Sequence, residues 1–269
     1  YMDYSIRDVS EFLNLSREMI RYYEKWGVLT PKRNEQNNYR SYTVLDVFML
    51  LDAIQYKSWG IPVKDMGRLR KGDFLEKVRV QLTEYQRELE EEAAYKALLS
   101  DRISFVAARS QTAHLNLKNF WVKVVPEHYF IPLVQGDGDS YGELQLGEQA
   151  AAILFSDRVA PFWNPCFEEV GNHQLWGFTL EKRYFDALQL PSLEGMRLRP
   201  EQICLCAIFD LGSVGHFNGE YAKPALEHLH RSGFEQAGTI DATLLGRGVE
   251  KDRDIRLMEL HIPLREKTL

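Results

Sequence analysis

The chain has 269 residues, of which 45% are hydrophobic and 27% are charged. This balance is typical of a globular protein with one or two domains. No run of about 20 apolar residues occurs, which excludes a transmembrane helix, and the first residues lack the pattern of a secretory signal. We therefore expect a cytoplasmic protein with no membrane partner, in which Cys166, Cys204 and Cys206 are free thiols.

Charge is distributed unevenly along the chain, whose formal net charge is −6. Residues 1–71 contain 12 Lys and Arg against 9 Asp and Glu, a net charge of +3, and the remainder has a net charge of −9. A positive segment in an otherwise acidic chain indicates that this segment alone contacts a polyanion such as DNA.

Two short helices joined by a tight turn are predicted at the start of the chain. Ser5 and Asp8 have the spacing of a capping box, so the first helix begins after Ser5. Asn14 suits the turn because asparagine tolerates a left-handed backbone. Ser16 then caps a second helix over residues 17–25. This arrangement predicts a helix-turn-helix.

The second helix and the segment after it carry residue types that bind nucleic acid. Arg17 and Arg21 are four residues apart and share one face of the helix. Residues 32–42 are predicted to form a small hairpin that turns at Asn37 and Asn38. Arginine reads guanine edges in the major groove, and tyrosine reaches phosphate. The predicted DNA-binding residues are Ser16, Arg17, Arg21, Tyr22, Lys32, Arg33, Tyr39, Arg40 and Tyr42.

Two further helices are predicted before residue 72. Thr43 and Asp46 form a second capping-box pair, which opens a helix that continues to about Trp59. Gly60 ends this helix, and Pro62 opens a fourth helix to about residue 71.

The order of these motifs resembles the MerR family of regulators. The resemblance rests on Arg21-Tyr22-Tyr23-Glu24, Asn38-Tyr39-Arg40-Ser41-Tyr42 and Trp59-Gly60-Ile61-Pro62. It implies a winged helix-turn-helix domain over residues 1–72 that binds double-stranded promoter DNA as a homodimer. It also implies RNA polymerase as a partner and activation by distortion of the DNA. The alternative is that the arginines are ordinary solvated surface charges.

Residues 73–112 are predicted to form one helix that dimerises as a coiled coil. The segment has no Pro or Gly, and its apolar residues follow alternating steps of three and four before a break near Ala93. The alternative is that this helix packs on its own chain. The apolar positions are Leu75, Val78, Leu82, Tyr85, Leu89, Leu99 and Ile103.

The C-terminal residues, 118–269, are predicted to form an α+β domain with an antiparallel sheet. Alternation in the last strand places Met258, Leu260 and Ile262 on one face, with Glu259 and His261 on the other. The predicted strands cover residues 121–125, 149–155, 175–180, 203–209 and 255–262, and a helix covers residues 221–231.

The segment Met258-Glu259-Leu260-His261-Ile262-Pro263 and the aromatic-rich strands before it resemble the gyrase-inhibitor-like effector domain of multidrug-sensing MerR regulators. The resemblance implies two βαββ halves and an aromatic cleft in which Glu259 faces a small lipophilic ligand. Cationic aromatic compounds are among the expected ligands, since a cation over an aromatic ring gains about 0.5–2 kcal/mol. The predicted ligand-binding residues are Tyr129, Tyr141, Phe155, Trp163, Trp176, Phe178, Phe209, Phe217, Tyr221 and Glu259.

We predict a regulator without catalytic activity, cofactor or bound metal, and two other functions remain open. In the first, the C-terminal domain also hydrolyses small molecules, with Glu259 as base and His261 as its partner. In the second, the chain senses metal or redox state. Cys204 and Cys206 share one face of a strand, but two thiols without a third ligand make a poor metal site.

Overall fold

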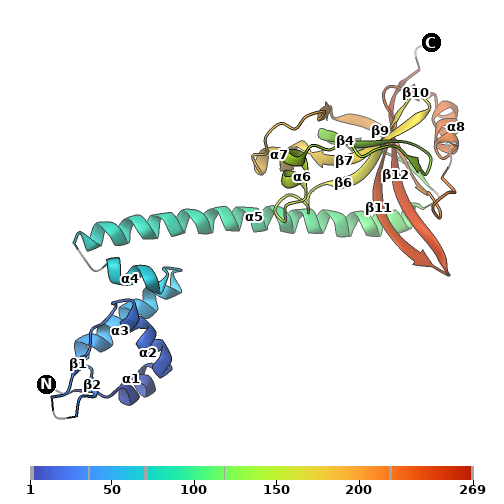
Figure 1. The fold of residues 1–269 in the computed structure, drawn as a ribbon. Coiled ribbons are helices and arrows are strands. Elements are labelled where there is room, and N and C mark those ends of the chain that lie inside the picture. Colours follow the sequence, from blue (N-terminus) through green and yellow to red (C-terminus); the bar gives the residue numbers. More distant parts are fainter. Residues whose placement is uncertain (1–2, 36, 70–71, 118, 218–219, 268–269) are drawn as a thin grey trace. The chain divides into compact units, whose positions relative to one another are not determined.

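The computed structural model describes residues 3–35, 37–69, 72–117, 119–217 and 220–267. Contacts divide the chain into two compact units, Tyr1–Ala94 and Tyr95–Leu269, and the division falls within a long helix (Figure 1). None of the described helices has the length and apolarity that crossing a membrane requires.

The N-terminal unit contains the predicted helix-turn-helix and wing. Both capping boxes are confirmed: Ser5 accepts a hydrogen bond from the amide of Asp8, and Thr43 accepts one from the amide of Asp46. Asn14 takes the left-handed conformation, with φ of 51°, at the turn between the first two helices. The elements are α1 Ile6–Leu13, α2 Arg17–Lys25, β1 Lys32–Arg33, β2 Arg40–Ser41, α3 Val44–Ser58 and α4 Val63–Leu69. The end predicted for the fourth helix, near residue 71, lies outside the described residues.

The long helix α5, Phe74–Asn116, is continuous, as predicted, and runs through the break in the apolar repeat near Ala93. Its apolar stripe has two environments. Val78, Leu82 and Tyr85 pack against the core of the N-terminal unit, as the alternative of packing on the same chain predicts. Leu75, Leu89 and Ile103 are instead largely exposed, so this part of the stripe lacks a hydrophobic cover in the single chain.

The C-terminal unit is built on one antiparallel sheet with the order β3-β9-β12-β11-β6-β7-β4-β5. β10 pairs with β12, and β8 pairs with β4. The strands are β3 Phe120–Val125, β4 His128–Asp137, β5 Ser140–Tyr141, β6 Asn164–Val170, β7 His173–Glu181, β8 Arg197–Arg199, β9 Gln202–Asp210, β10 Phe234–Gln236, β11 Asp241–Glu250 and β12 Arg253–Glu266. The helices are α6 Glu148–Leu154, α7 Lys182–Ala187 and α8 Lys223–Arg231.

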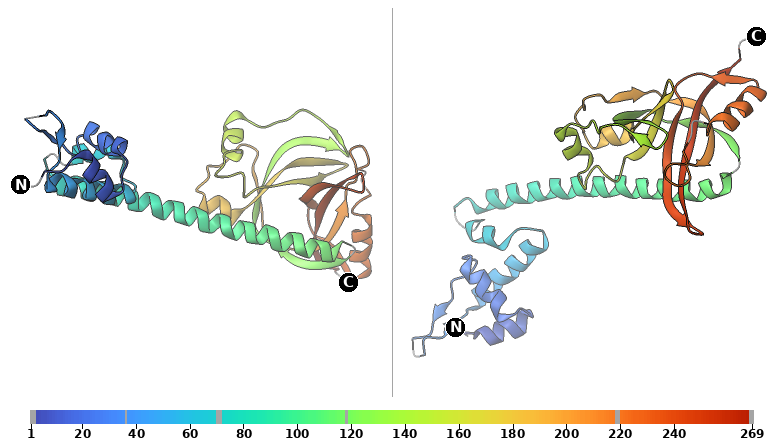
Figure 2. Two further views of the ribbon diagram at one scale, coloured as in Figure 1. Left: turned by 90° about the horizontal axis from the view of Figure 1, so that it is seen from below. Right: turned by 45° about the vertical axis from the view of Figure 1, so that its right-hand side comes forward.

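The predicted duplication is visible in the topology. The first half runs β4, α6, β6, β7 and the second runs β9, α8, β11, β12, so each half contains a strand, a helix and two strands. The halves join where β6 pairs with β11, with Phe167 opposite Ala242. Figure 2 shows the strands of this unit and the helix α8 from two further sides. Each half has its own core, one beside α6 and α7 and the other beside α8.

One predicted strand is wrong. Residues 149–155 were expected to be extended, but α6 occupies Glu148–Leu154. Three consecutive alanines, Ala150 to Ala152, favour a helix, and a short apolar run carries no periodicity that separates the two conformations. The other predicted strands and the helix near residues 221–231 are confirmed.

Candidate functional site

The exposed face of α2 carries the basic residues predicted to contact DNA. Arg17, Arg21 and Tyr22 are exposed, while Ile20 and Tyr23 from the same helix are buried in the core. Ser16 accepts a hydrogen bond from the amide of Met19 and so caps the helix at the end nearest Arg17. The helix therefore presents both arginines on a surface that a DNA groove can reach.

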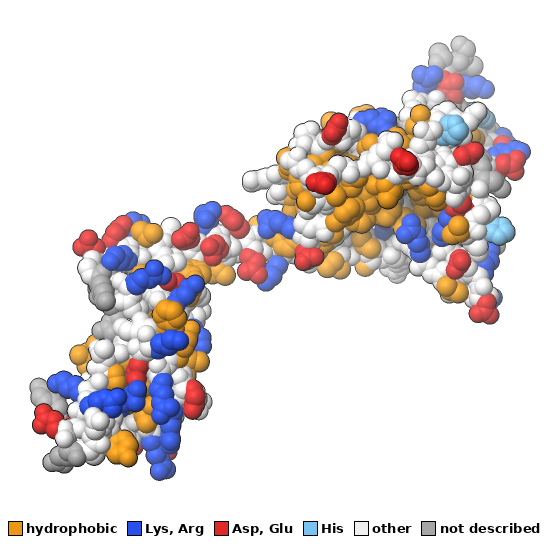
Figure 3. Space-filling model, viewed as in Figure 1, with side chains coloured by type: hydrophobic (Ala, Val, Ile, Leu, Met, Phe, Trp, Pro, Cys, Tyr) orange, Lys and Arg blue, Asp and Glu red, His pale blue; other side chains and the backbone are white. Residues whose placement is uncertain are grey.

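The wing between β1 and β2 presents three more of the predicted residues. Lys32, Arg33 and Tyr39 are exposed. Arg33 donates to the carbonyl of Asn38 at 3.0 Å, and Asn38 takes a left-handed conformation at the turn. Figure 3 shows Lys and Arg side chains gathered on one face of the N-terminal unit.

Tyr42, predicted to bind phosphate, is fully buried and cannot contact DNA directly. Its hydroxyl donates to Glu24, which also accepts from Arg40 Nε at 2.8 Å. Burial, followed by the Glu24 carboxylate, raises the pKa of Tyr42 well above its usual value. Tyr42 and half-buried Arg40 therefore hold the base of the wing against α2.

In the C-terminal unit, Glu259 lies buried at the centre of a charged network. One carboxylate oxygen accepts from Arg109 Nε at 2.7 Å, and the other is paired with Lys123. His261 Nε2 lies 3.8 Å from the Lys123-bound oxygen. Burial alone would raise the pKa of Glu259, but His261, Arg109 and Lys123 together hold it well below its usual value. Such a carboxylate is a weak base, which disfavours the hydrolase alternative.

The sequence did not point to Arg109 or Lys123. Arg109 lies on α5 and Lys123 on β3, 150 and 136 residues before Glu259. No local spacing links residues this far apart, so only the packing of α5 on the sheet could identify them. The polar contacts of Glu259 in the described chain come from these cations and His261.

Strand register places Glu259 on the opposite face of the sheet from the predicted aromatic residues. Residues directly opposite in antiparallel strands share a face. Glu259 pairs with Ile208, whereas Phe209 pairs with Met258. Met258 is one position along β12 from Glu259, so Phe209 and Glu259 lie on different faces. Across the neighbouring strands, Trp176 pairs with Phe167, and Phe167 pairs with Ala242. Ala242 in turn pairs with Leu260, which lies on the same face of β12 as Met258. The structure therefore does not bring Glu259 and the aromatic rings into one cleft.

The aromatic residues themselves form two groups and a separate pair. Phe155, Trp163 and Phe178 contact one another with ring centroids 4.5–6.1 Å apart in the first half. A second group lies around Phe167 in the other core. Tyr129 instead pairs with Phe185 at 4.4 Å. The members of the second group are Tyr141, Trp176, Phe209, Phe217 and Tyr221.

Part of the first aromatic group is accessible to solvent. Phe155 is half exposed, and Trp163 is partly exposed with its indole N–H bonded to the carbonyl of Leu154 at 2.7 Å. Figure 3 shows hydrophobic side chains gathered over the strands β4, β6 and β7 of this unit. Phe209, Phe217 and Tyr221 instead pack within the second core.

The three cysteines are all buried. Burial raises the pKa of the Cys204 thiol to about 12 and that of Cys206 further. Cys204 and Cys206 belong to a small hydrophobic cluster with Val125 and Trp121, as expected for core residues. The sequence did not reveal that Glu259 and His261 lie beside Cys206.

Comparisons with known proteins concern mainly the N-terminal unit. Residues 4–72 match the family model described as MerR HTH family regulatory protein. An uncharacterized HTH-type transcriptional regulator of Bacillus subtilis, YyaN, is 34% identical over 76 residues, which are 28% of this chain and 55% of that protein. The HTH-type transcriptional regulator CueR of Escherichia coli is 32% identical over 65 residues, 24% of this chain and 48% of CueR. The chain thus spans about half the length of the curated relatives it matches.

Solved structures give weak overall similarity. A cryo-EM structure of an EcmrR–DNA complex in EcmrR-RPo is 13% identical and covers 98% of this chain and 100% of that chain, with a TM-score of 0.33. The structure of HiNmlR, a MerR family regulator lacking the sensor domain and bound to promoter DNA, is 22% identical. It covers 42% of this chain and 94% of that chain, with a TM-score of 0.32. The assignment therefore rests on the sequence match and on the capping boxes, turn and wing of the N-terminal unit. Residues 4–72 thus match the family of MerR HTH regulatory proteins in sequence, and the described part of this segment forms a helix-turn-helix followed by a wing.

Proposed function

We propose that the whole protein is a dimeric transcriptional regulator of promoter DNA, controlled by a small lipophilic compound that binds its C-terminal unit. The observation that carries the proposal is the pair of exposed arginines, Arg17 and Arg21, one turn apart on α2 beside an exposed basic wing. This is the arrangement by which a helix-turn-helix inserts one helix into the major groove and contacts the backbone beside it.

A second copy of the chain fits the exposed part of the α5 stripe. Leu75, Leu89 and Ile103 expose large apolar side chains, and burying each one gains about 1.5–3 kcal/mol. Two copies place two recognition helices on one duplex. We propose that the dimer activates transcription with RNA polymerase by altering the shape of the promoter, which is a form of indirect readout.

Replacing Arg21 tests the DNA-binding surface. We expect Arg21→Ala to weaken binding of the selected operator by about 10-fold or more, because one arginine contact to a guanine contributes about 1–3 kcal/mol. The operator is first selected from a random duplex library with the wild-type protein, and binding is then measured by fluorescence anisotropy at fixed salt.

Arg87→Ala is the matched control, because Arg87 is an exposed arginine on α5 that pairs with Glu91. Its affinity for the operator should stay within about threefold of the wild type, as expected for a surface charge away from DNA. Equal affinities of the Arg21→Ala variant and the wild type would remove α2 from the interface.

We propose that the ligand binds to the accessible aromatic group, Phe155, Trp163 and Phe178. Its flat rings accept apolar compounds of different shapes, and a cation gains further attraction over the indole of Trp163. Glu259 lies on the opposite face and is already paired with Arg109 and Lys123, so we do not assign it to this ligand site. The sequence-based expectation that Glu259 faces the ligand is therefore revised.

Replacing Phe155 and Glu259 in turn, as Phe155→Ala and Glu259→Gln, distinguishes a ligand site at the aromatic group from one at Glu259. Phe155 is half exposed, so truncation removes ligand contact at modest cost to the core. We expect calorimetric titration with tetraphenylphosphonium to show affinity reduced by about 10-fold or more, the loss of about 1.4 kcal/mol of stacking. Glu259→Gln should leave the affinity unchanged. A loss confined to Glu259→Gln would instead place the ligand on the other face of the sheet.

A further inference from the structure

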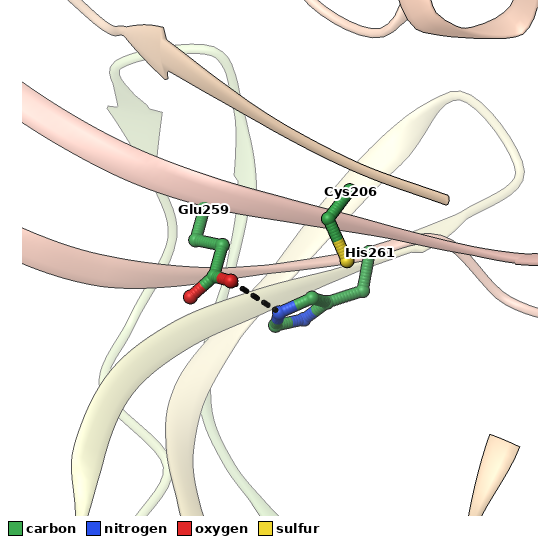
Figure 4. A group of neighbouring side chains, drawn as sticks. All are labelled: Cys206, Glu259 and His261. Carbon is green, nitrogen blue, oxygen red and sulfur yellow. Dashed lines mark ion pairs between the residues drawn. The ribbon is translucent and has the colours of Figure 1, made fainter. Parts of the chain in front are cut away.

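The face of the C-terminal sheet that carries Glu259 also places a thiol and an imidazole beside it (Figure 4). Cys206 on β9 is directly opposite His261 on β12, and Glu259 is two residues from His261 on the same face. All three side chains are buried, and one potential ligand atom from each lies within 4.8 Å of the other two.

His261 has one ring nitrogen engaged and the other without a hydrogen bond. Nδ1 lies 2.7 Å from a carboxylate oxygen of Asp241. Nε2 is buried and has no hydrogen-bond partner among the described residues. It points toward the Glu259 carboxylate, 3.8 Å away, which is too long for a hydrogen bond (Figure 4). A histidine held by a carboxylate through one nitrogen is the usual arrangement of a metal ligand that binds through the other.

We propose that Cys206, Glu259 and His261 bind a divalent transition-metal ion of the Zn²⁺ or Co²⁺ type. A thiolate, an imidazole and a carboxylate form a ligand set that suits these ions. In a tetrahedral site with ordinary bond lengths, neighbouring ligand atoms are about 3.3–3.5 Å apart. The three atoms, which lie within 4.8 Å of one another, therefore need to approach by about 1.5 Å or less, which rotation of the Cys206 and Glu259 side chains can supply.

A fourth coordination position can be supplied by water. A cavity of about 60 Å³ lies beside His261, lined in part by Lys123, Asp241 and Thr243. This volume is enough for a water molecule with several polar neighbours. The site would therefore have three protein ligands and one exchangeable position, the pattern of an open metal centre rather than a closed structural one.

The two cations at Glu259 do not prevent this coordination. Lys123 holds the same oxygen that lies near His261, and one third of its side chain is exposed, so its ammonium group can move into solvent. Arg109 holds the other oxygen and can remain there. Metal binding displaces the proton of the Cys206 thiol into solvent, and the negative charges of the resulting thiolate and of the Glu259 carboxylate then offset the charge of the ion.

Cobalt provides a direct test, because Co²⁺ bound to a thiolate absorbs strongly in the near ultraviolet. The full-length protein is titrated with Co²⁺ in the presence of a thiol-free reductant, followed by competition with Zn²⁺. We expect one Co²⁺ per chain with a thiolate-to-metal absorption band, which Zn²⁺ abolishes. Cys206→Ser should remove the band, and His261→Gln should lower Co²⁺ affinity by at least tenfold.

Cys204→Ser is the matched control, since Cys204 is buried on the same strand and the same face, two residues from Cys206. The Cys204→Ser protein should retain the band and its stoichiometry. Absence of the band in the wild type would overturn the proposal, as would its persistence in Cys206→Ser or an equal loss in Cys204→Ser. The titration involves neither DNA nor a lipophilic compound, so its outcome is independent of the regulatory proposal.

Discussion

Asp139→Asn is expected to destabilise the C-terminal unit by about 3–5 kcal/mol, because it leaves a buried guanidinium without its carboxylate. Asp139 binds Arg256 through both oxygens, at 2.6 and 2.9 Å. It also accepts from the amides of Gly215, at 2.7 Å, and Phe217, at 3.2 Å. Both charged side chains are almost completely buried. The pair joins the β4–β5 turn of the first half to β12 of the second.

The stabilisation by Asp139 should depend on pH. The hydrogen bond from Arg256, aided by those from Phe217 and Gly215 and opposed by burial, holds the pKa of Asp139 well below its usual value. A carboxylate with a depressed pKa in the folded state stabilises the protein fully above the unfolded-state pKa of about 3.9, and the effect is lost as pH falls toward the folded-state pKa. The free energies of unfolding of wild type and Asp139→Asn should therefore converge below about pH 4.

Urea unfolding followed by hydrogen exchange of the C-terminal unit measures this difference between pH 3 and pH 7. Asp254→Asn is the control, because Asp254 is an exposed aspartate on the same strand as Arg256 and should change stability by less than about 0.5 kcal/mol. Replacing both partners, as Asp139→Asn with Arg256→Met, should be less destabilising than the single change. A pH-independent difference between wild type and Asp139→Asn would contradict the role of the ionised pair.

Features encoded by residues close in sequence were predictable. The Ser5–Asp8 and Thr43–Asp46 capping boxes and the turn at Asn14 depend on neighbours within a few positions. Alternation in β12 likewise predicted that Glu259 and Met258 lie on different faces of that strand. Such signals are physical consequences of capping chemistry and side-chain period, so they can be read without knowing the fold.

Features that depend on register and packing were not predictable. Alternation assigns each strand two faces but does not say which faces of different strands coincide. Glu259 and Trp176 were therefore placed in one cleft, although the pairing of β12, β11, β6 and β7 puts them on opposite faces. The contact of Arg109 with Glu259 and that of Asp139 with Arg256 join residues more than 100 positions apart.

The close approach of α4 to the end of α2 is another long-range feature, and it occurs at Gly67. A β-carbon built at Gly67 would lie 2.0 Å from the carbonyl oxygen of Trp26 and 3.1 Å from its carbonyl carbon. Both atoms belong to Trp26, the residue that caps the C-terminal end of α2. Side-chain rotation cannot relieve this contact, so α4 and the end of α2 would have to separate.

We expect Gly67→Ala to destabilise the N-terminal unit by about 3 kcal/mol or more, although alanine in an unhindered helix gains about 1 kcal/mol over glycine. The backbone clash decides the sign, since separating α4 from α2 also loosens the core around Met66 and Leu69. Hydrogen exchange in urea should show earlier opening of residues 4–69, and operator affinity should fall with it because Arg17 and Arg21 lose their fixed support. Lys64→Ala, an exposed change in the same helix, should leave stability within about 0.5 kcal/mol of the wild type. An unchanged or raised stability of Gly67→Ala would mean that α4 does not pack this closely against Trp26.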